Sequence, residues 1–388
     1  SITRFVKGWG SIEAGIDHVR LNTYRHSGIT LKVQNNEGTF NHHSNVSSLW
    51  NGFLSRYRTL VRIQAGYYDT NTTTELPTAS TQGIFVMDKE ISIDASTNDL
   101  TLQCASLRSI FDEVRAREVG GLGVAQSAGA IMALFRDYTD GAGIAVFQQF
   151  ISTGAWTIET NSSNIYNLAT TTTLENLTVW DVMNKLAESE RKVVFLTRVG
   201  GLRFEDRPTA TGTASFTFRG QNFNKQNILK LYDYKEALNK VYTVYRMKYL
   251  EAETSTSYVT AGTTTAVNSS NTSWLYGNRV YQFENRFPNN TATAQAIVDA
   301  MFSLTSSPRI ECRVTSKPAP TVDIHDSVFL SYRSYDASTQ PLWDAVNWDQ
   351  FNWAQEGQNF DWTNRTFRVI SRRFNLDNFT MDWGLREV

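Results

Sequence analysis

Histidine pairs are the first residues in this sequence that could carry chemistry, since neutral imidazoles bind transition metals. His42 and His43 are adjacent in a polar stretch, and no Glu or Cys stands at ligand spacing nearby. Adjacent residues of an extended chain point to opposite faces, so this pair cannot easily share one ion. His325, between Ile324 and Asp326, is better explained as a hydrogen-bond partner at a strand end. The sequence therefore predicts no metal site.

A glycine-dense stretch at residues 119–124 (VGGLGV) could suggest a phosphate-binding loop. A P-loop requires Lys-Ser or Lys-Thr after its glycines, and neither follows here. The dinucleotide fingerprint requires a preceding strand, whereas residues 112–118 form a charged segment with helical character. We interpret the stretch as a flexible linker into a helix near Ile131.

Nucleophiles and carboxylates give no better candidate for catalysis. The nucleophile motif Gly-x-Ser-x-Gly is absent, and Ser127-Ala128-Gly129 has no recognisable triad partner. Carboxylates such as Glu205-Asp206 are numerous, but nothing marks two of them as a glycosidase pair, which we keep only as a minor hypothesis. We expect a protein that is not an enzyme and that has no catalytic residues and no cofactor.

Tryptophans near the C-terminal end form the densest unusual feature of the sequence. Acids and amides accompany four of them, which are Trp343, Trp348, Trp353 and Trp362. Such rings could stack on sugars, as in a lectin, or could anchor a long loop through their apolar faces and indole N–H groups. Their spacing matches neither one helix face nor one strand face. We therefore favour assembly or loop anchors and keep sugar binding as the alternative.

The composition is that of a folded chain without a dominant charge. Its 388 residues are 41% hydrophobic and 19% charged, with a net charge of −1, so no overall field attracts nucleic acid or membrane. No apolar run reaches the length of a membrane segment, and the first residues have no apolar signal-peptide core. Cys104 and Cys312 are best read as two small buried hydrophobes, with a single disulfide left open.

Alternating apolar residues predict strands in the first part of the chain. They occur at residues 29–33, 61–65, 84–86, 91–93 and 100–104, with a turn at 96–99. Residues 70–82 are polar and Thr-rich, which predicts a loop. Several short strands with regular turns indicate a sandwich or a small barrel.

The middle of the chain changes to helical spacing. Apolar residues predict helices near residues 107–114 and 131–138, and the best helix covers 178–190. There Thr178 can cap the helix with Asp181 as the partner of a capping box, and Met183 lies on the apolar stripe. Strands at 193–197 and 202–204 flank Gly200-Gly201, a pair suited to a tight hairpin turn.

The last part of the chain returns to strands from Leu229 onward. Further strands are predicted at residues 239–245, 310–314, 328–332 and in a final pair around 367–369 and 379–385. One helix is predicted at residues 294–301, and residues 251–273 are predicted to be a loop or the tip of a long hairpin. The strand-rich outer thirds of the chain are loosely alike, which hints at two related β-domains.

Charge is distributed unevenly along the chain. Residues 191–250 contain twelve Lys or Arg against four Asp or Glu, whereas 321–366 contain seven acids against two bases. Solvated faces are one explanation, and complementary contacts between subunits are the other.

Three stretches together carry a resemblance to a known family. They are 29–40 (ITLKVQNNEGTF) with 57–66 and 83–88; the helix at 177–188 with the strands that end at Asp206; and 294–304 with 310–328, 367–370 and 380–387 (TMDWGLRE). In this order they resemble the baseplate hub and tail-tip hub proteins of tailed bacteriophages.

The resemblance implies a mainly β fold, with two tube-like β-barrel domains flanking a small α+β domain. We place the first barrel at residues 1–110, the α+β insert at 111–228 and the second barrel, with the Trp-rich loop, at 229–388. These boundaries are approximate, and the first barrel could be discontinuous in sequence. Many such hubs continue into a peptidase, spike or fibre region; this sequence ends at Val388, so lysis or receptor binding is expected on other proteins.

The function that the resemblance implies is a structural hub in the virion, at the tail tip or baseplate. It would be a homotrimeric ring that caps the tail tube, adapts six-fold to three-fold symmetry and lets the genome pass. Implied partners are a hexameric distal tail or tube protein, the tape measure protein, central spike or fibre proteins, and DNA only in transit. A distal tail adaptor ring and a sugar-binding receptor protein are the alternatives.

Overall fold

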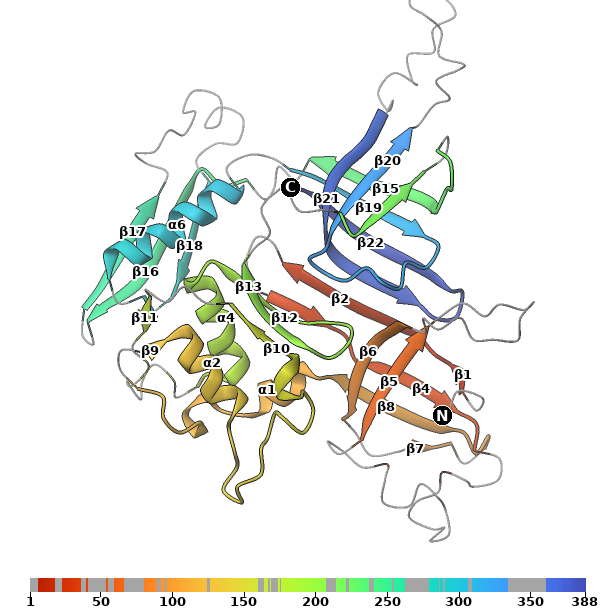
Figure 1. Cartoon of the computed structure of the whole chain (residues 1–388), viewed down its shortest axis with the longest axis horizontal. Helices are drawn as coiled ribbons and strands as arrows, with labels where there is room; N and C mark the ends of the chain where they lie inside the picture. Colours follow the sequence, from red (N-terminus) through yellow and green to blue (C-terminus); the bar gives the residue numbers. More distant parts are fainter. Residues whose placement is uncertain are drawn as a thin grey trace, which may run out of the picture.

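The computed structural model describes most of the chain. The described residues are 6–17, 23–35, 40, 54, 59–65, 80–88, 92–94, 96–123, 126–159, 164–166, 168, 174, 176–206, 214–220, 223–236, 241–252, 255–261, 279–285, 287–288, 290–305, 309–333 and 361–388. In this part of the chain no helix combines the length and the apolar character needed to cross a membrane. Strands predominate in it, which confirms the predicted mainly β fold with α+β structure in the middle (Figure 1).

The first sheet is built from the N-terminal part of the chain. Its strands are β1 (Val6–Gly8), β4 (Ile29–Val33), β5 (Leu60–Ala65), β6 (Ser80–Met87), β7 (Ser92–Ile93) and β8 (Leu100–Ser106). They are ordered β1-β4-β8-β6-β5, with β7 paired to β8. Alternate residues of β4 and β8 are buried, as the sequence pattern predicted, because one face of the sheet covers an apolar core.

One prediction for this region is wrong. The loop expected at residues 70–82 ends earlier, since β6 begins at Ser80 and pairs with β5 through Thr81 and Ser80. These residues are polar, yet Gln82 is fully buried because its side-chain amide donates hydrogen bonds to the carbonyls of Ser80 and Pro320. Polarity indicated a loop here because sequence alone does not show such partners.

The second sheet combines strands from both ends of the chain. Its strands are β2 (Ser11–Asp17), β3 (Thr23–His26), β14 (Phe216–Arg219), β15 (Ile228–Glu236), β19 (Ile310–Ser316), β20 (Ser327–Arg333), β21 (Asp361–Asn375) and β22 (Thr380–Glu387). The order is β14-β20-β21-β22-β19-β15, and β2 joins through β21 and carries β3. The sheet curls into a half-barrel, with β2 between it and the first sheet (Figure 1).

The central unit is a small α+β structure. It contains α1 (Arg108–Glu113), η2 (Ala116–Glu118), β9 (Gln126–Ser127), α2 (Ala128–Arg136), η3 (Thr153–Ala155), β10 (Trp156–Ile158), β11 (Ile165–Tyr166), α4 (Val179–Ser189), β12 (Lys192–Leu196) and β13 (Leu202–Asp206). The predicted capping box at Thr178 and Asp181 begins α4, and Met183 on its apolar stripe is fully buried. The predicted hairpin is present as β12–β13, where Gly200 has the positive φ (+80°) that a glycine tolerates best.

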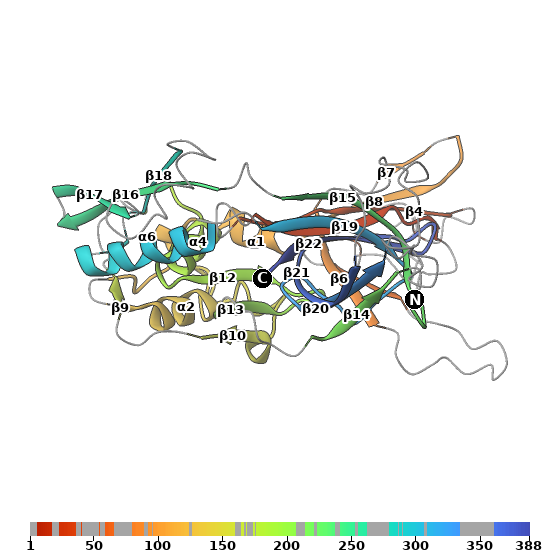
Figure 2. The same ribbon diagram turned by 90° about the horizontal axis from the view of Figure 1, so that it is seen from above.

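A smaller unit follows β15 and packs beside α4. It consists of β16 (Val244–Ala252), β17 (Ser255–Ala261), β18 (Val280–Glu284) and α6 (Thr291–Thr305). The hairpin interpretation of the stretch after residue 250 is confirmed as far as Ala261, because β16 and β17 pair antiparallel. In Figure 2 the helix α6 lies under this three-stranded sheet, and its predicted apolar stripe, from Ala294 to Met301, is buried.

Cys104 and Cys312 are both buried and free, so the interpretation as small hydrophobes is confirmed and no disulfide joins them. Both lie in the apolar core that the two large sheets share.

Candidate functional site: a buried polar junction

Of the four predicted Trp anchors, the structure describes Trp362. Trp343, Trp348 and Trp353 lie outside the described residues. Trp362 lies on β21 with 7% of its surface exposed, and its ring centroid is 5.4 Å from that of Tyr234 on β15. The contact joins two strands that are not neighbours in the sheet order, so Trp362 helps to hold the curl of the half-barrel.

The other residues considered for chemistry are not gathered into a site. His42 and His43 lie outside the described residues, and among the described ones no three His, Cys, Asp or Glu are placed to hold a metal ion. His325 is buried, and its backbone N–H donates to the carbonyl of Val369 at 2.9 Å. Asp206 forms an ion pair with the buried Lys192 at 2.6 Å, which is a structural role.

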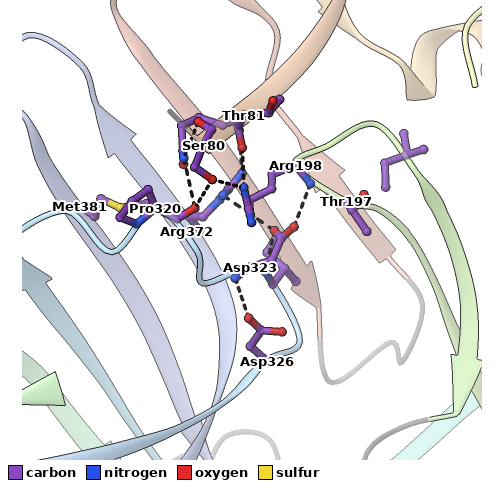
Figure 3. Close-up of polar contacts among 12 residues, drawn as sticks. Ser80, Thr81, Thr197, Arg198, Pro320, Asp323, Asp326, Arg372 and Met381 are labelled. Atoms are coloured by element: carbon purple, nitrogen blue, oxygen red, sulfur yellow. Dashed lines mark hydrogen bonds and ion pairs between the residues drawn. The ribbon is translucent and has the colours of Figure 1, made fainter. Parts of the chain in front are cut away.

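A polar junction, with Arg372 and Gln82 buried at its centre, lies where the first sheet, the central unit and the second sheet meet (Figure 3). The first sheet contributes the beginning of β6. Ser80 Oγ donates to the carbonyl oxygen of Pro320 at 3.0 Å, and Gln82 Nε2 donates to the same oxygen at 3.1 Å. Pro320 precedes β20, so these bonds connect the first sheet to the second.

Arg372 of β21 contributes the second component of the junction. The side chain is almost fully buried, and its Nη2 donates to the carbonyl oxygen of Gln82 at 2.9 Å. Its Nη1 lies 3.8 Å from Asp323 Oδ1, so the buried cation has a carboxylate beside it. Removal of one partner would leave a buried charge without its counterpart, at a cost of roughly 3–5 kcal/mol.

The central unit enters the junction through Arg198, in the turn between β12 and β13. Its backbone N–H donates to Asp323 Oδ2 at 2.8 Å, and its Nη1 donates to the carbonyl of Thr81 at 2.7 Å and to Ser80 Oγ. Burial lowers the pKa of Arg198, and the nearby Asp323 opposes that shift. Asp323 thus accepts from a backbone amide of one part and faces an arginine of another.

Two further contacts extend the junction towards β3. Tyr24, fully buried, donates through its hydroxyl to the carbonyl of Leu196 at 2.8 Å, and its own carbonyl accepts from Arg108 Nη1 at 2.7 Å. Burial raises the pKa of Tyr24. His26 nearby has a pKa lowered to about 4, by burial first and then by the charge of Arg372, so its ring is neutral near pH 7.

The turn of the hairpin packs directly on the first sheet. A Cβ added at Gly200 would lie 2.8 Å from Ile84 Cδ1, so any larger residue would force the isoleucine side chain to move, and the positive φ at this position also favours glycine. The hydrogen bonds of the junction and this packing contact together hold the hairpin against the first sheet. The arrangement contains no reactive constellation, and what it can do is to hold three parts of the chain in one fixed relation.

The residues of the junction were not predicted from the sequence. Ser80 and Gln82 fell in an expected loop, and Arg198 was only part of an expected hairpin turn. The alternation of β21 did not mark Arg372 as buried, because a bulge between Val369 and Ser371 changes the phase of the buried side chains.

A solved structure has a similar overall fold. The tail protein from Neisseria meningitidis MC58 superposes with a TM-score of 0.51 at 10% identity, over 99% of this chain and 95% of that one. This chain has the fold of a tail protein.

Two other tail proteins match over similar lengths. The 43 kDa tail protein of prophage MuSo2 from Shewanella oneidensis has a TM-score of 0.49 at 10% identity, covering 98% of this chain and 94% of that one. A prophage tail protein from Listeria monocytogenes EGD-e has a TM-score of 0.47 at 12% identity, covering 98% and 89%. No family profile and no curated protein matches the sequence. The resemblance stated from the sequence is confirmed at the level of the tail-protein fold.

Proposed function

We propose that this protein is a non-enzymatic structural component of a bacteriophage virion, located in the tail at its tip or baseplate. Its role is that of a hub: three copies form a ring that caps the tail tube, adapts six-fold to three-fold symmetry and lets the genome pass. Its proposed partners are a hexameric distal tail or tube protein, the tape measure protein and central spike or fibre proteins. DNA is a partner only in transit.

The observation that carries this proposal is the buried junction between the two large sheets. In a ring built from two sheet domains per copy, the two domains must keep a fixed relative orientation, because otherwise the diameter of the channel would vary. The junction provides this through Arg372, Arg198 and Asp323, which link the first sheet, the central unit and the second sheet. The division at residues 110 and 228 belongs to the same proposal, with β2, β3 and β14 crossing to the second sheet.

Charge supports the assignment of DNA as a passing molecule. A protein that binds duplex DNA tightly neutralises many phosphates, whereas the net charge here is −1. The basic stretch 191–250 is proposed to lie at subunit contacts or on the outer wall, away from the channel.

The proposal is tested by the mass and symmetry of the purified chain. Native mass spectrometry is expected to give three copies, and negative-stain images are expected to show rings with a central opening. Labelled antibody on intact tails should mark the distal end. A chain that stays monomeric, or a label along the tube, would contradict the hub assignment.

A further inference from the structure

The loop that follows α2 is a pre-organised protrusion. Asp140 Oδ1 accepts hydrogen bonds from the backbone N–H groups of Ala142 and Ile144, both at 2.9 Å. Two backbone hydrogen bonds close the same turn. The N–H of Gly143 donates to the carbonyl of Asp140, and the N–H of Asp140 donates to the carbonyl of Ile144, each at 2.9 Å. These bonds fix the loop before any partner arrives, which reduces the entropy lost on binding.

An apolar side chain stands near the tip of this loop. Ile144 has 51% of its surface exposed, and the loop extends away from the body of the molecule in Figure 1. Asp140 itself is exposed. Burial is the main reason that the pKa of Tyr138 is raised, and the negative charges of Glu118 and Asp140 raise it further, so these two carboxylates make the surroundings of the loop acidic. A surface that fits this loop should therefore offer an apolar contact beside positive charge.

Strand β15, at one end of the second sheet, offers such a surface. Leu229 has 54% of its surface exposed, and Lys230 and Lys235 are exposed on the same strand. The strand also carries the exposed Asp233, but Asp233 forms an ion pair with Arg313 of β19, so the two lysines leave the surface positive. The strand has register shifts between Ile228 and Lys230 and between Tyr232 and Lys235. Such bulges disturb the backbone ladder and discourage the addition of another strand, so a partner here would bind through side chains.

We propose that the α2 loop of one copy docks on β15 of a second copy, with Ile144 against Leu229 and Asp140 facing Lys230. The opposite charges and the two exposed apolar side chains complement each other. In Figure 1 the loop extends below α2, whereas β15 lies at the opposite, upper side of the molecule. A contact between two different surfaces is heterologous, and it builds a ring when the rotation between copies closes. The inference rests on the ring proposed above and identifies one of its contacts.

Cysteine crosslinking of the full-length chain tests the contact directly. Ile144→Cys and Leu229→Cys are made in separate chains, and Cys104 and Cys312 are buried, which limits background reaction. Under mild oxidation the mixture is expected to give a disulfide-linked dimer, whereas each variant alone is not. A dimer of Ile144→Cys alone would indicate loop-to-loop contact and overturn the proposal.

A second measurement concerns the strength of association. Leu229→Asp and Ile144→Asp are each expected to raise the dissociation constant of the oligomer at least about tenfold. Ile165→Asp, at a residue of similar exposure (45%) on β11, is the matched control and should leave it unchanged. Unchanged melting temperatures exclude misfolding.

The outcomes separate the two proposals. An intact trimer with no crosslink, and with no effect of either aspartate, would overturn this contact while leaving the ring in place. A wild-type chain that is monomeric at all concentrations would overturn both.

Discussion

The guanidinium of Arg372 donates a hydrogen bond to the backbone carbonyl of Gln82, which lies 290 residues earlier in the chain. The bond crosses from the second sheet to the first, and the nearest carboxylate, Asp323, comes from a third segment. The neighbouring Arg373 connects even more distant segments through its ion pair with Glu13, but that pair is about half exposed, whereas Arg372 is buried.

Arg372→Met is expected to lower the free energy of unfolding by about 3 kcal/mol, because the substitution leaves Asp323 without its buried cation. Arg373→Met is the matched control. Arg373 is the next residue of β21, and its ion pair with Glu13 is about half exposed, so the loss should be below about 1 kcal/mol. Urea unfolding gives both values. Equal losses of unfolding free energy in the two variants would show that the buried contacts of Arg372 stabilise the fold no more than the exposed ion pair of Arg373.

Met183→Asp tests the packing of α4. Met183 is fully buried, so a carboxylate there is expected to destabilise the protein by several kcal/mol, roughly. Lys185→Asp, two residues later on a partly exposed position, should have a much smaller effect. The melting temperature and the helical circular dichroism signal report the difference. If Met183→Asp melts like the wild type, the assignment of the buried stripe is wrong.

Trp362→Ala is expected to lower stability by about 2–5 kcal/mol, because the ring is buried against Tyr234 and Phe367. Trp362→Phe should keep most of the stability, because it retains an aromatic ring at this position. We expect similar losses, in stability or in assembly, for Trp348→Ala and Trp353→Ala if those rings are buried. A glycan array separates the alternatives: sugar binding by the wild type that disappears in a stable Trp variant would support the receptor interpretation.

His26 should make the folded state sensitive to acid. Its pKa is lowered from 6.5 to about 4, so between these values the unfolded chain binds a proton that the folded chain does not. The free energy of unfolding therefore decreases as the pH falls through this window, by about 3 kcal/mol in total from this group. In the His26→Phe variant, the free energy of unfolding should lack this decrease at low pH. Unfolding curves at several pH values between 4 and 7 measure it, and parallel profiles for the two proteins would refute the assignment.

Gly384→Ala should be destabilising for a steric reason. A Cβ at this position would lie 2.2 Å from Ser371 Oγ on the adjacent strand β21. The serine side chain must move or the strands must separate, at a cost of about 1–3 kcal/mol. The double variant Gly384→Ala with Ser371→Gly removes the contact and should recover most of the loss. A double variant no more stable than the single one would mean that the strain has another origin.

The local elements of this protein could be predicted from the sequence because their determinants are neighbours in the chain. The capping box at Thr178 and Asp181, the glycine pair of the β12–β13 hairpin and the alternation in β4, β8 and β22 all act within a few residues. The resemblance to tail proteins depended on such segments in their order. It anticipated the fold correctly.

The junction was decided only by the tertiary structure. In β21 the buried side chains change phase: Phe367 and Val369 face the core before a bulge near Ser371, and Arg372 and Phe374 are buried after it. Without the bulge, strict alternation places Arg372 on the outer face, so its burial could not be read from the pattern. Likewise β2 pairs with β21, more than 350 positions away, and Gln82 depends on a carbonyl of Pro320. Burial of a polar group becomes favourable only when partners from distant segments arrive together, and that arrangement exists only in the folded chain.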